Sequence, residues 1–208
     1  MAQFFRVHPV NPQPRLITQA VAILSEGGVA VYPTDSCYAM GCRIGDKEAL
    51  ERIRHIRRLD ERHNLTLMCR DLSELAIYAK VGNAAFRMMN SLTPGPYTFL
   101  LSATRDVPRR LQHPKRKTIG MRVPDNAIAL ALLTAMAEPI LSTSLILPEE
   151  TLPMTDPGEI NEHLGSLVEL IMDGGVCGLE PTTVIDLAEG QPLIVRQGKG
   201  HVPAMATG

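Results

Sequence analysis

Hydroxyl and guanidinium side chains recur in this 208-residue chain at the points where predicted β-strands end. Such groups suit an anionic ligand, because their O–H and N–H bonds donate to phosphate or carboxylate oxygens. Each group alone is explained equally well by turn or helix-cap chemistry. The groups are Thr34, the connection of residues 57–63, Arg122, Ser142, Thr143, Ser144, Thr182, Thr183 and Arg196.

One predicted strand presents the first of these groups. Residues 29–32 are apolar and partly β-branched, which is typical of a buried strand, and Pro33 ends it by removing a ladder donor. Thr34 then lies at the carboxyl end of the strand, where open α/β sheets place their ligands. A plain loop from there to Asp46, which would cap the next helix, explains the same residues.

The familiar catalytic motifs are missing from the sequence, which has no G-x-S-x-G elbow, P-loop or dinucleotide-binding glycine pattern. His55, His63 and Cys69 do not match the spacing of a zinc site, so no metal site is predicted on protein ligands. The four cysteines lack C-x-x-C spacing, and we expect them to be reduced thiols.

Composition predicts one folded domain. The chain is 45% hydrophobic and 21% charged, which supplies a core and excludes disorder by composition. Aromatic residues make up 4% and Trp is absent, so any nucleic-acid contact would depend on charge more than on base stacking. No membrane-spanning run or signal-peptide pattern occurs, and we expect a cytoplasmic monomer.

The net charge of −1 conceals an uneven distribution. Residues 43–122 carry 17 Lys and Arg against 8 Asp and Glu, whereas residues 123–208 carry 2 against 12. The basic segment would suit nucleotide phosphates or RNA. Two solvated faces of one domain explain the same numbers, because position in the sequence does not fix position on the surface.

Hydrophobic periodicity predicts an α/β fold, with helices and strands alternating in the first half and strands dominating the end. We expect a single domain with a twisted sheet, largely parallel with antiparallel strands, and helices packed on it. Its core would span residues 4–198, and residues 199–208 would form a tail. The predicted helices are 14–26, one from Asp46 through Ile56, 72–78, 83–91, 127–137 and 160–164; the predicted strands are 4–7, 29–32, 65–69, 97–101, 118–123, 140–143, 167–172, 182–187 and 193–195.

Six short motifs resemble the YrdC-like family and keep its order along nearly the whole chain. They are G-V-A-V-Y-P-T-D-S-x-Y-x-x-G at 28–41, P-G-P-x-T at 94–98, G-x-R-V-P at 120–124, S-T-S at 142–144, P-T-T-V-I-D at 181–186 and V-R-x-G at 195–198. The YciO-type branch is the most similar, through R-R-L at 57–59 and H-N-L-T-L-M at 63–68.

The resemblance implies a YrdC/RibB-like fold and a relation to threonylcarbamoyl-AMP synthases. These enzymes join threonine, bicarbonate and ATP, with Mg²⁺, into an intermediate for tRNA modification. The family fold is also associated with binding double-stranded RNA or tRNA. By position in the motifs, the resemblance implies a catalytic set of Arg57, His63 and Ser144, and a nucleotide and amino-acid set of Arg57, Arg58, Ser142, Ser144, Arg196, Thr34 and Thr183. The basic middle segment of the chain supplies the expected RNA-binding set of Arg109, Arg110, Lys115, Arg116 and Lys117.

Two residues depart from the synthase pattern. Leu59 stands where synthases carry an arginine, and Ile146 where they carry an asparagine. Losing one transition-state donor typically costs roughly 10²–10³ in rate, although Arg58 or Arg62 lies close enough in sequence to compensate for Leu59. Two functions follow: a nucleotide- and RNA-binding protein with slow synthase activity, or an RNA-binding module that has lost the chemistry.

Overall fold

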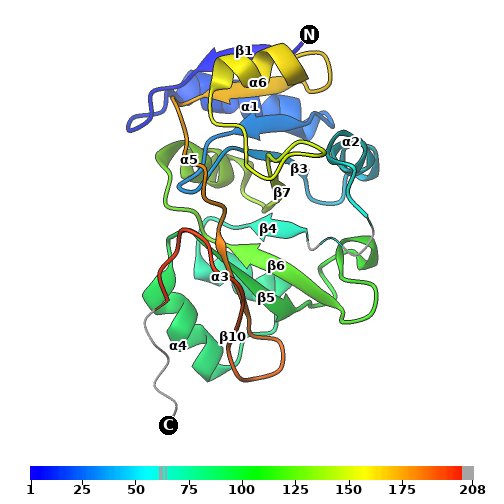
Figure 1. Ribbon diagram of the computed structural model, residues 1–208, viewed down its shortest axis with the longest axis vertical. Helices are drawn as coiled ribbons and strands as arrows, with labels where there is room; N and C mark the ends of the chain where they lie inside the picture. The colour runs from blue at the N-terminus through cyan, green and yellow to red at the C-terminus, as the bar shows by residue number, and fades with distance from the viewer. Residues whose placement is uncertain (61–62, 64, 203–208) are drawn as a thin grey trace.

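The computed structural model describes residues 1–60, 63 and 65–202. Figure 1 shows one long sheet that runs from β1 near the N-terminus to β10 at the opposite end, with helices packed against it. In chain order the elements are β1 (Gln3–Arg6), α1 (Pro14–Ser25), β2 (Ala30–Tyr32), β3 (Ala39–Arg43), α2 (Lys47–Arg57), β4 (Thr66–Met68), α3 (Leu72–Tyr78), α4 (Asn83–Leu92), β5 (Tyr97–Ser102), the 3₁₀ turn η1 (Arg109–Leu111), β6 (Thr118–Arg122), α5 (Ala127–Met136), β7 (Ile140–Ser144), α6 (Pro157–Leu164), β8 (Leu170–Asp173), β9 (Thr183–Asp186) and β10 (Leu193–Arg196).

The sheet is mixed, as predicted. Its strand order is β1-β8-β2-β3-β7-β4-β6-β5-β9-β10. Four neighbouring pairs are parallel, namely β1–β8, β8–β2, β4–β6 and β5–β9, and the other pairs are antiparallel. The expectation of a single α/β domain with a mixed sheet is therefore confirmed, although parallel pairs do not predominate.

Strand alternation divides the side chains between two faces of the sheet. On one face, α2, α3, α4 and α6 pack over a core that runs the length of the sheet, with Leu67, Phe99 and Ile185 in it. On the other face, α1 and α5 pack over a smaller core that includes Tyr32 and Ile140. These two helices reach only one half of their face, so strands β4, β6, β5 and β9 leave side chains there without a helix above them.

Strand β3 corrects the predicted loop between Pro33 and Asp46. Residues Ala39–Arg43 form a strand between β2 and β7, and its first four residues are buried. Its small and flexible residues carry little β-propensity of their own, so the strand forms because its neighbours pair with both of its edges. Gly41 within it lies opposite Ser142.

Capping residues explain where several helices begin. Asp46 accepts a hydrogen bond from the backbone N–H of Ala49 at the start of α2, as predicted, and Asn126 caps α5 by accepting from two backbone N–H groups. Helix α6 starts at Pro157, three residues before the predicted helix, because Asp156 caps it and Pro157 fits the first helical turn.

The last described residues pack on the domain and do not behave as a tail. Tyr97 donates a hydrogen bond to the carbonyl of His201, and Lys199 reaches the carbonyl of Asp35. Residues 203–208 lie outside the described part of the chain. Within the described part no helix is long and apolar enough to cross a membrane, and the four cysteines are free, as expected.

Candidate functional site

A cavity of about 380 Å³ occupies the part of the sheet face that α1 and α5 do not cover. Most of the predicted ligand-binding groups meet there, although they come from distant parts of the sequence. The residues that line it are Ala39, Arg57, His63, Thr66, Met68, Thr98, Leu100, Arg122, Ser142, Thr143, Ser144, Ile146, Thr182, Val184, Val195 and Arg196.

The floor of the cavity is the sheet itself. Alternate residues of β4 and β5 point into it, and Gly120 of β6 lies between them. A Cβ atom at Gly120 would lie 2.7 Å from the hydroxyl of Thr66 and 3.2 Å from the methyl group of Thr98. Glycine at this position thus keeps the two threonine side chains close together in the floor.

Two of the arginines that line the cavity are Arg57 and Arg196. Arg57 ends helix α2, and the left-handed backbone of Arg58 turns the chain away after it. The Nε of Arg57 is buried and has no hydrogen-bond partner among the described residues. Burial lowers the pKa of Arg57 to about 10, so the group stays charged at neutral pH.

Arg196 comes from the end of β10 and is fixed by the backbone beside it. Its Nη2 and Nε donate to the carbonyl oxygen of Thr182 at 2.8 and 3.2 Å. Partial burial lowers its pKa as well. The ion pairs of the described residues involve neither Arg196 nor Arg57. Among the residues that the structure describes, no ion pair therefore neutralises the charges of Arg57 and Arg196.

His63 lies at the rim, where its Nε2 is 3.4 Å from the hydroxyl oxygen of Thr143. The pKa of His63 is lowered, first because part of the ring is buried and then because Arg57 repels a second positive charge, with a smaller contribution from Arg196. At neutral pH this histidine is therefore predominantly neutral, and one ring nitrogen can accept a proton.

Hydroxyl groups on three strands complete the polar wall. Ser142 and Ser144 point into the cavity from β7, and Tyr32 donates a hydrogen bond to the Ser142 oxygen at 3.0 Å. Thr98 and Thr182 hydrogen-bond to each other at 2.8 Å across β5 and the start of β9. The apolar residues of the lining include Met68, Leu100, Ile146, Val184 and Val195.

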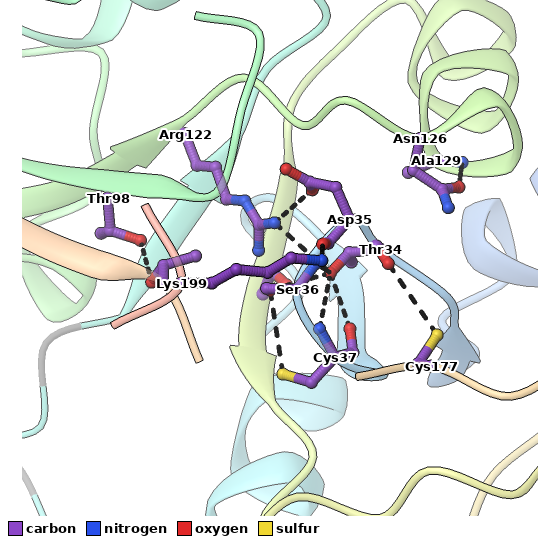
Figure 2. A network of polar contacts seen from close by, with 12 residues as sticks. Thr34, Asp35, Ser36, Cys37, Thr98, Arg122, Asn126, Ala129, Cys177 and Lys199 are labelled. Atoms are coloured by element: carbon purple, nitrogen blue, oxygen red, sulfur yellow. Dashed lines mark hydrogen bonds and ion pairs between the residues drawn. The ribbon is translucent and has the colours of Figure 1, made fainter. Parts of the chain in front are cut away.

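Arg122, which lines the cavity, also joins the network of polar contacts in the loop after β2 that Figure 2 shows. The Thr34 hydroxyl donates to the carbonyl of Cys37 at 2.6 Å and accepts from the backbone N–H of Ser36 at 3.2 Å. Arg122 donates to Thr34 at 3.3 Å and forms a buried ion pair with Asp35. Thr34 organises this turn and is not among the residues that line the cavity.

Two other predicted site residues also lie away from the cavity. Thr183 is fully buried, and its hydroxyl donates to the carbonyl of Gly200 at 2.6 Å, while its neighbour Thr182 lines the cavity. Arg58 is exposed and pairs with Glu149 at 3.0 Å. The structure thus brings together Arg57, His63, Ser142, Ser144 and Arg196 from the predicted set.

The two departures from the synthase pattern occupy different places. Ile146 lines the cavity, so an aliphatic side chain replaces an amide within the site. Leu59 instead lines a wider surface depression of about 1210 Å³ over α2 and residues 166–169, and Arg58 lies beside it. Arg62, the other residue that was expected to compensate for Leu59, lies outside the described residues.

The predicted RNA-binding residues are all exposed, but three of them already have partners. Arg116 forms ion pairs with Asp186 at 2.6 Å and Glu189 at 3.6 Å. The Arg110 side chain donates to the carbonyl of Gly45. Arg109, Lys115 and Lys117 project from the same segment, and Lys117 donates to the carbonyl of Pro114 at 2.6 Å.

Sequence reasoning did not select the floor of the cavity as part of the site. In the sequence these floor residues look like ordinary strand residues. Helices cover most strands of α/β folds, so the sequence does not indicate which strand face stays open. The residues are Thr66, Met68, Leu100 and Val184. Thr98 carried a signal, since it ends the P-G-P-x-T motif, but a threonine in a strand needs no functional explanation.

A family model described as "Telomere recombination" (Sua5_yciO_yrdC) matches residues 22–198 of this chain. The chain belongs to the Sua5/YciO/YrdC family. It is 60% identical over 202 residues to the uncharacterized protein YciO of Escherichia coli K12, which covers 97% of this chain and 98% of that protein. The crystal structure of E. coli YciO has a TM-score of 0.95 to it, with 97% and 98% of the two chains covered.

Threonylcarbamoyl-AMP synthases are more distant relatives within the family. The synthase of Halorhodospira halophila is 29% identical over 184 residues, which are 88% of this chain and 95% of that protein. The crystal structure of Pyrococcus abyssi Sua5 complexed with L-threonine has a TM-score of 0.87 at 26% identity. That match covers 95% of this chain and 58% of the Sua5 chain. The chain is thus a YciO-type protein related to these synthases.

The position of His63 predicts a specific titration. Its pKa in the folded protein lies below 6.5, its ordinary value, so the unfolded chain binds the proton first as the pH falls. The contribution of His63 to stability is therefore present above about pH 6.5 and is lost below it. In an NMR titration of the ring, Arg57→Ala should raise the His63 pKa, whereas Arg58→Ala should leave it unchanged. An unchanged value in Arg57→Ala would contradict the assignment of Arg57 as the repelling charge.

Proposed function

We propose that the cavity binds a nucleotide, ATP or AMP, and that it forms threonylcarbamoyl-AMP slowly from ATP, threonine and bicarbonate. One observation carries the proposal: Arg57 and Arg196 line one cavity and neither has a carboxylate partner among the described residues. Unpaired guanidinium groups beside hydroxyl donors are the chemistry that recognises phosphates.

The reaction requires alignment and charge stabilisation. The amino group of threonine forms a C–N bond to the carbon of bicarbonate, and a C–O bond breaks as water leaves. One oxygen of the resulting carbamate attacks the α-phosphorus of ATP. The bond between that phosphorus and the oxygen bridging to the β-phosphate breaks, and pyrophosphate leaves with the electron pair. Arg57 and Arg196 would hold the negative charge, and Ser142 and Ser144 would orient the phosphate oxygens. Threonine is included because the related P. abyssi Sua5 was crystallised with L-threonine.

Magnesium belongs to the proposal as the counter-ion of ATP. Mg²⁺ is usually bound through substrate phosphates with one or two carboxylates, and it keeps several waters. The described residues contain no group of three or more His, Cys, Asp or Glu side chains that could hold a metal ion. The phosphates of ATP would therefore supply most of the protein-side ligands of Mg²⁺. The hydroxyl groups of the cavity would not replace them.

ATP binding should depend on Arg57 and not on its neighbour. Charged hydrogen bonds contribute about 1.5–3 kcal/mol, so Arg57→Ala should weaken ATP binding by roughly 10- to 100-fold. Arg58→Ala is the matched control, because it removes the same charge one residue away at an exposed ion pair. Isothermal titration calorimetry with ATP and Mg²⁺ makes the measurement. Equal losses in both variants would show that general positive charge, and not the cavity, attracts ATP.

The aliphatic side chain of Ile146 leads us to expect slow turnover in the proposed synthase reaction. An aliphatic side chain in the cavity wall offers no donor to a developing charge, and one such donor is worth roughly 10²–10³ in rate. Threonine-dependent release of pyrophosphate should therefore be slow in this protein and should rise about tenfold or more in Ile146→Asn. Ile146→Val, which keeps the wall apolar, should give no increase. Pyrophosphate release that does not depend on threonine in either protein would contradict the proposed reaction.

Binding to double-stranded RNA is the second proposed function. It would be the protein's function if the synthase reaction has been lost. Its support is that Arg109, Arg110, Lys115, Arg116 and Lys117 are all exposed within one segment. The pairing of Arg116 with Asp186 reduces the charge that this residue can offer to phosphates. Arg109 and Lys115 therefore make the larger contribution.

Charge reversal separates RNA binding from nonspecific attraction. Arg109→Glu combined with Lys115→Glu should weaken binding to a short RNA duplex and lower the slope of log K against log salt by about 2, because each lost phosphate contact lowers it by about 1. Arg6→Glu combined with Arg15→Glu gives the same change of charge at exposed positions near β1 and should have little effect. Fluorescence anisotropy at several salt concentrations measures both. Equal slopes for the two double variants would remove the proposed surface.

A further inference from the structure

We propose that Tyr32 is a positioning residue that makes Ser142 a hydrogen-bond donor toward the anion in the cavity. The proposal rests on the function proposed above and adds to it a residue that does not itself line the cavity. Tyr32 is completely buried on β2, whereas Ser142 lies on β7 and lines the cavity. The hydroxyl of Tyr32 lies 3.0 Å from the hydroxyl of Ser142.

Strand β3 lies between these two residues, and its small side chains leave room for the contact. Ala39 pairs with Tyr32 and Gly41 pairs with Ser142 across the sheet. A Cβ atom at Gly41 would lie 2.8 Å from the Tyr32 hydroxyl oxygen. Any side chain at position 41 would therefore displace the phenol, so the contact depends on glycine in the strand between them.

The direction of this hydrogen bond follows from the surroundings of Tyr32. If Ser142 donated to Tyr32, the phenol hydrogen would be left buried without an acceptor, because the described residues give the Tyr32 hydroxyl no other partner. An unsatisfied buried donor costs about 1–3 kcal/mol, whereas donation by Tyr32 satisfies both groups. Burial also raises the pKa of Tyr32 well above its usual value, so the phenol keeps its proton.

The consequence is a fixed role for Ser142. A hydroxyl has one hydrogen to donate and rotates freely when nothing restrains it. Once its oxygen accepts from Tyr32, the serine hydrogen is available to point into the cavity, where Arg57 and Arg196 also lie. Phosphate oxygens accept hydrogen bonds, so this orientation suits an anion. It would not suit a cation, which cannot accept the serine hydrogen.

The decisive test is a double-mutant cycle on anion affinity. Tyr32→Phe should weaken the binding of ATP by about three- to tenfold, the usual range for one neutral hydrogen bond, and Ser142→Ala should weaken it at least as much. The double variant should bind like Ser142→Ala alone, because Tyr32 acts through Ser142. Calorimetry with ATP and, separately, with inorganic pyrophosphate gives the affinities, and thermal unfolding without ligand checks that each variant folds.

Tyr38→Phe is the matched control. It also removes a buried phenol hydroxyl, but that hydroxyl donates to the carbonyl of Gly175 at 2.7 Å and does not contact Ser142. It should leave ATP affinity unchanged even if it lowers the unfolding temperature. A merely structural role of Tyr32 would give additive losses in the double variant, which would overturn the inference.

The remaining outcomes separate this inference from the proposed function. If Arg57→Ala weakens ATP binding while Tyr32→Phe does not, the cavity binds nucleotide and the role of Tyr32 is refuted. If the unaltered protein binds neither ATP nor pyrophosphate, the proposed function and the inference both fail. If pyrophosphate binds with the expected coupling and ATP does not, Tyr32 positions Ser142 for an anion other than ATP.

Discussion

The positive charge in the cavity is the constraint on which the rest of the site depends. Arg57 and Arg196 come from distant parts of the sequence and line the same cavity, and a carboxylate partner would have placed either of them in a structural ion pair. The nearby carboxylate of Asp35 is instead engaged by Arg122. Partly burying two guanidinium groups without an ion pair among the described residues is unfavourable for folding, and an anion bound as proposed would offset that cost.

The sheet makes this arrangement possible because one layer of helices ends halfway across it. Where α1 and α5 pack, the face consists of apolar side chains such as Ile140. Two residues further along β7, the same face presents Ser142 to the cavity. The transition from core to site therefore occurs along a single strand, which explains how hydroxyl groups come to lie beside a rigid and well-packed region.

The motifs in the sequence predicted the fold and the meeting of Arg57, His63, Ser142, Ser144 and Arg196. The sequence could not predict which neighbour of a pair faces the cavity: Thr182 does and Thr183 does not, since this depends on where β9 begins. Strand β3 was missed because pairing, not propensity, makes it a strand. The engagement of Thr34 in its own turn also required coordinates, since a threonine after a strand suits a ligand and a turn equally.

The two departures from the synthase pattern lie at different places relative to the cavity. Arg57 of α2, Ser142 of β7 and Arg196 of β10 all line the cavity. The aliphatic side chain of Ile146 lies in the same lining and leaves the two arginines in place. Leu59 lies in a different depression, so its effect on the cavity would have to pass through the backbone at the end of α2. The change at Ile146 thus lies within the cavity, whereas the change at Leu59 lies outside it.

The pairing of β1 with β8 has a consequence for how the molecule is made. The first strand of the chain has no partner until residues 170–173 exist, and Lys199 meets the carbonyl of Asp35 across 164 residues. Contacts so remote in sequence slow folding, because a long loop must close before they form. On the ribosome the amino-terminal strand would leave the exit tunnel long before its partner is synthesised. The complete native sheet can therefore form only near the end of translation.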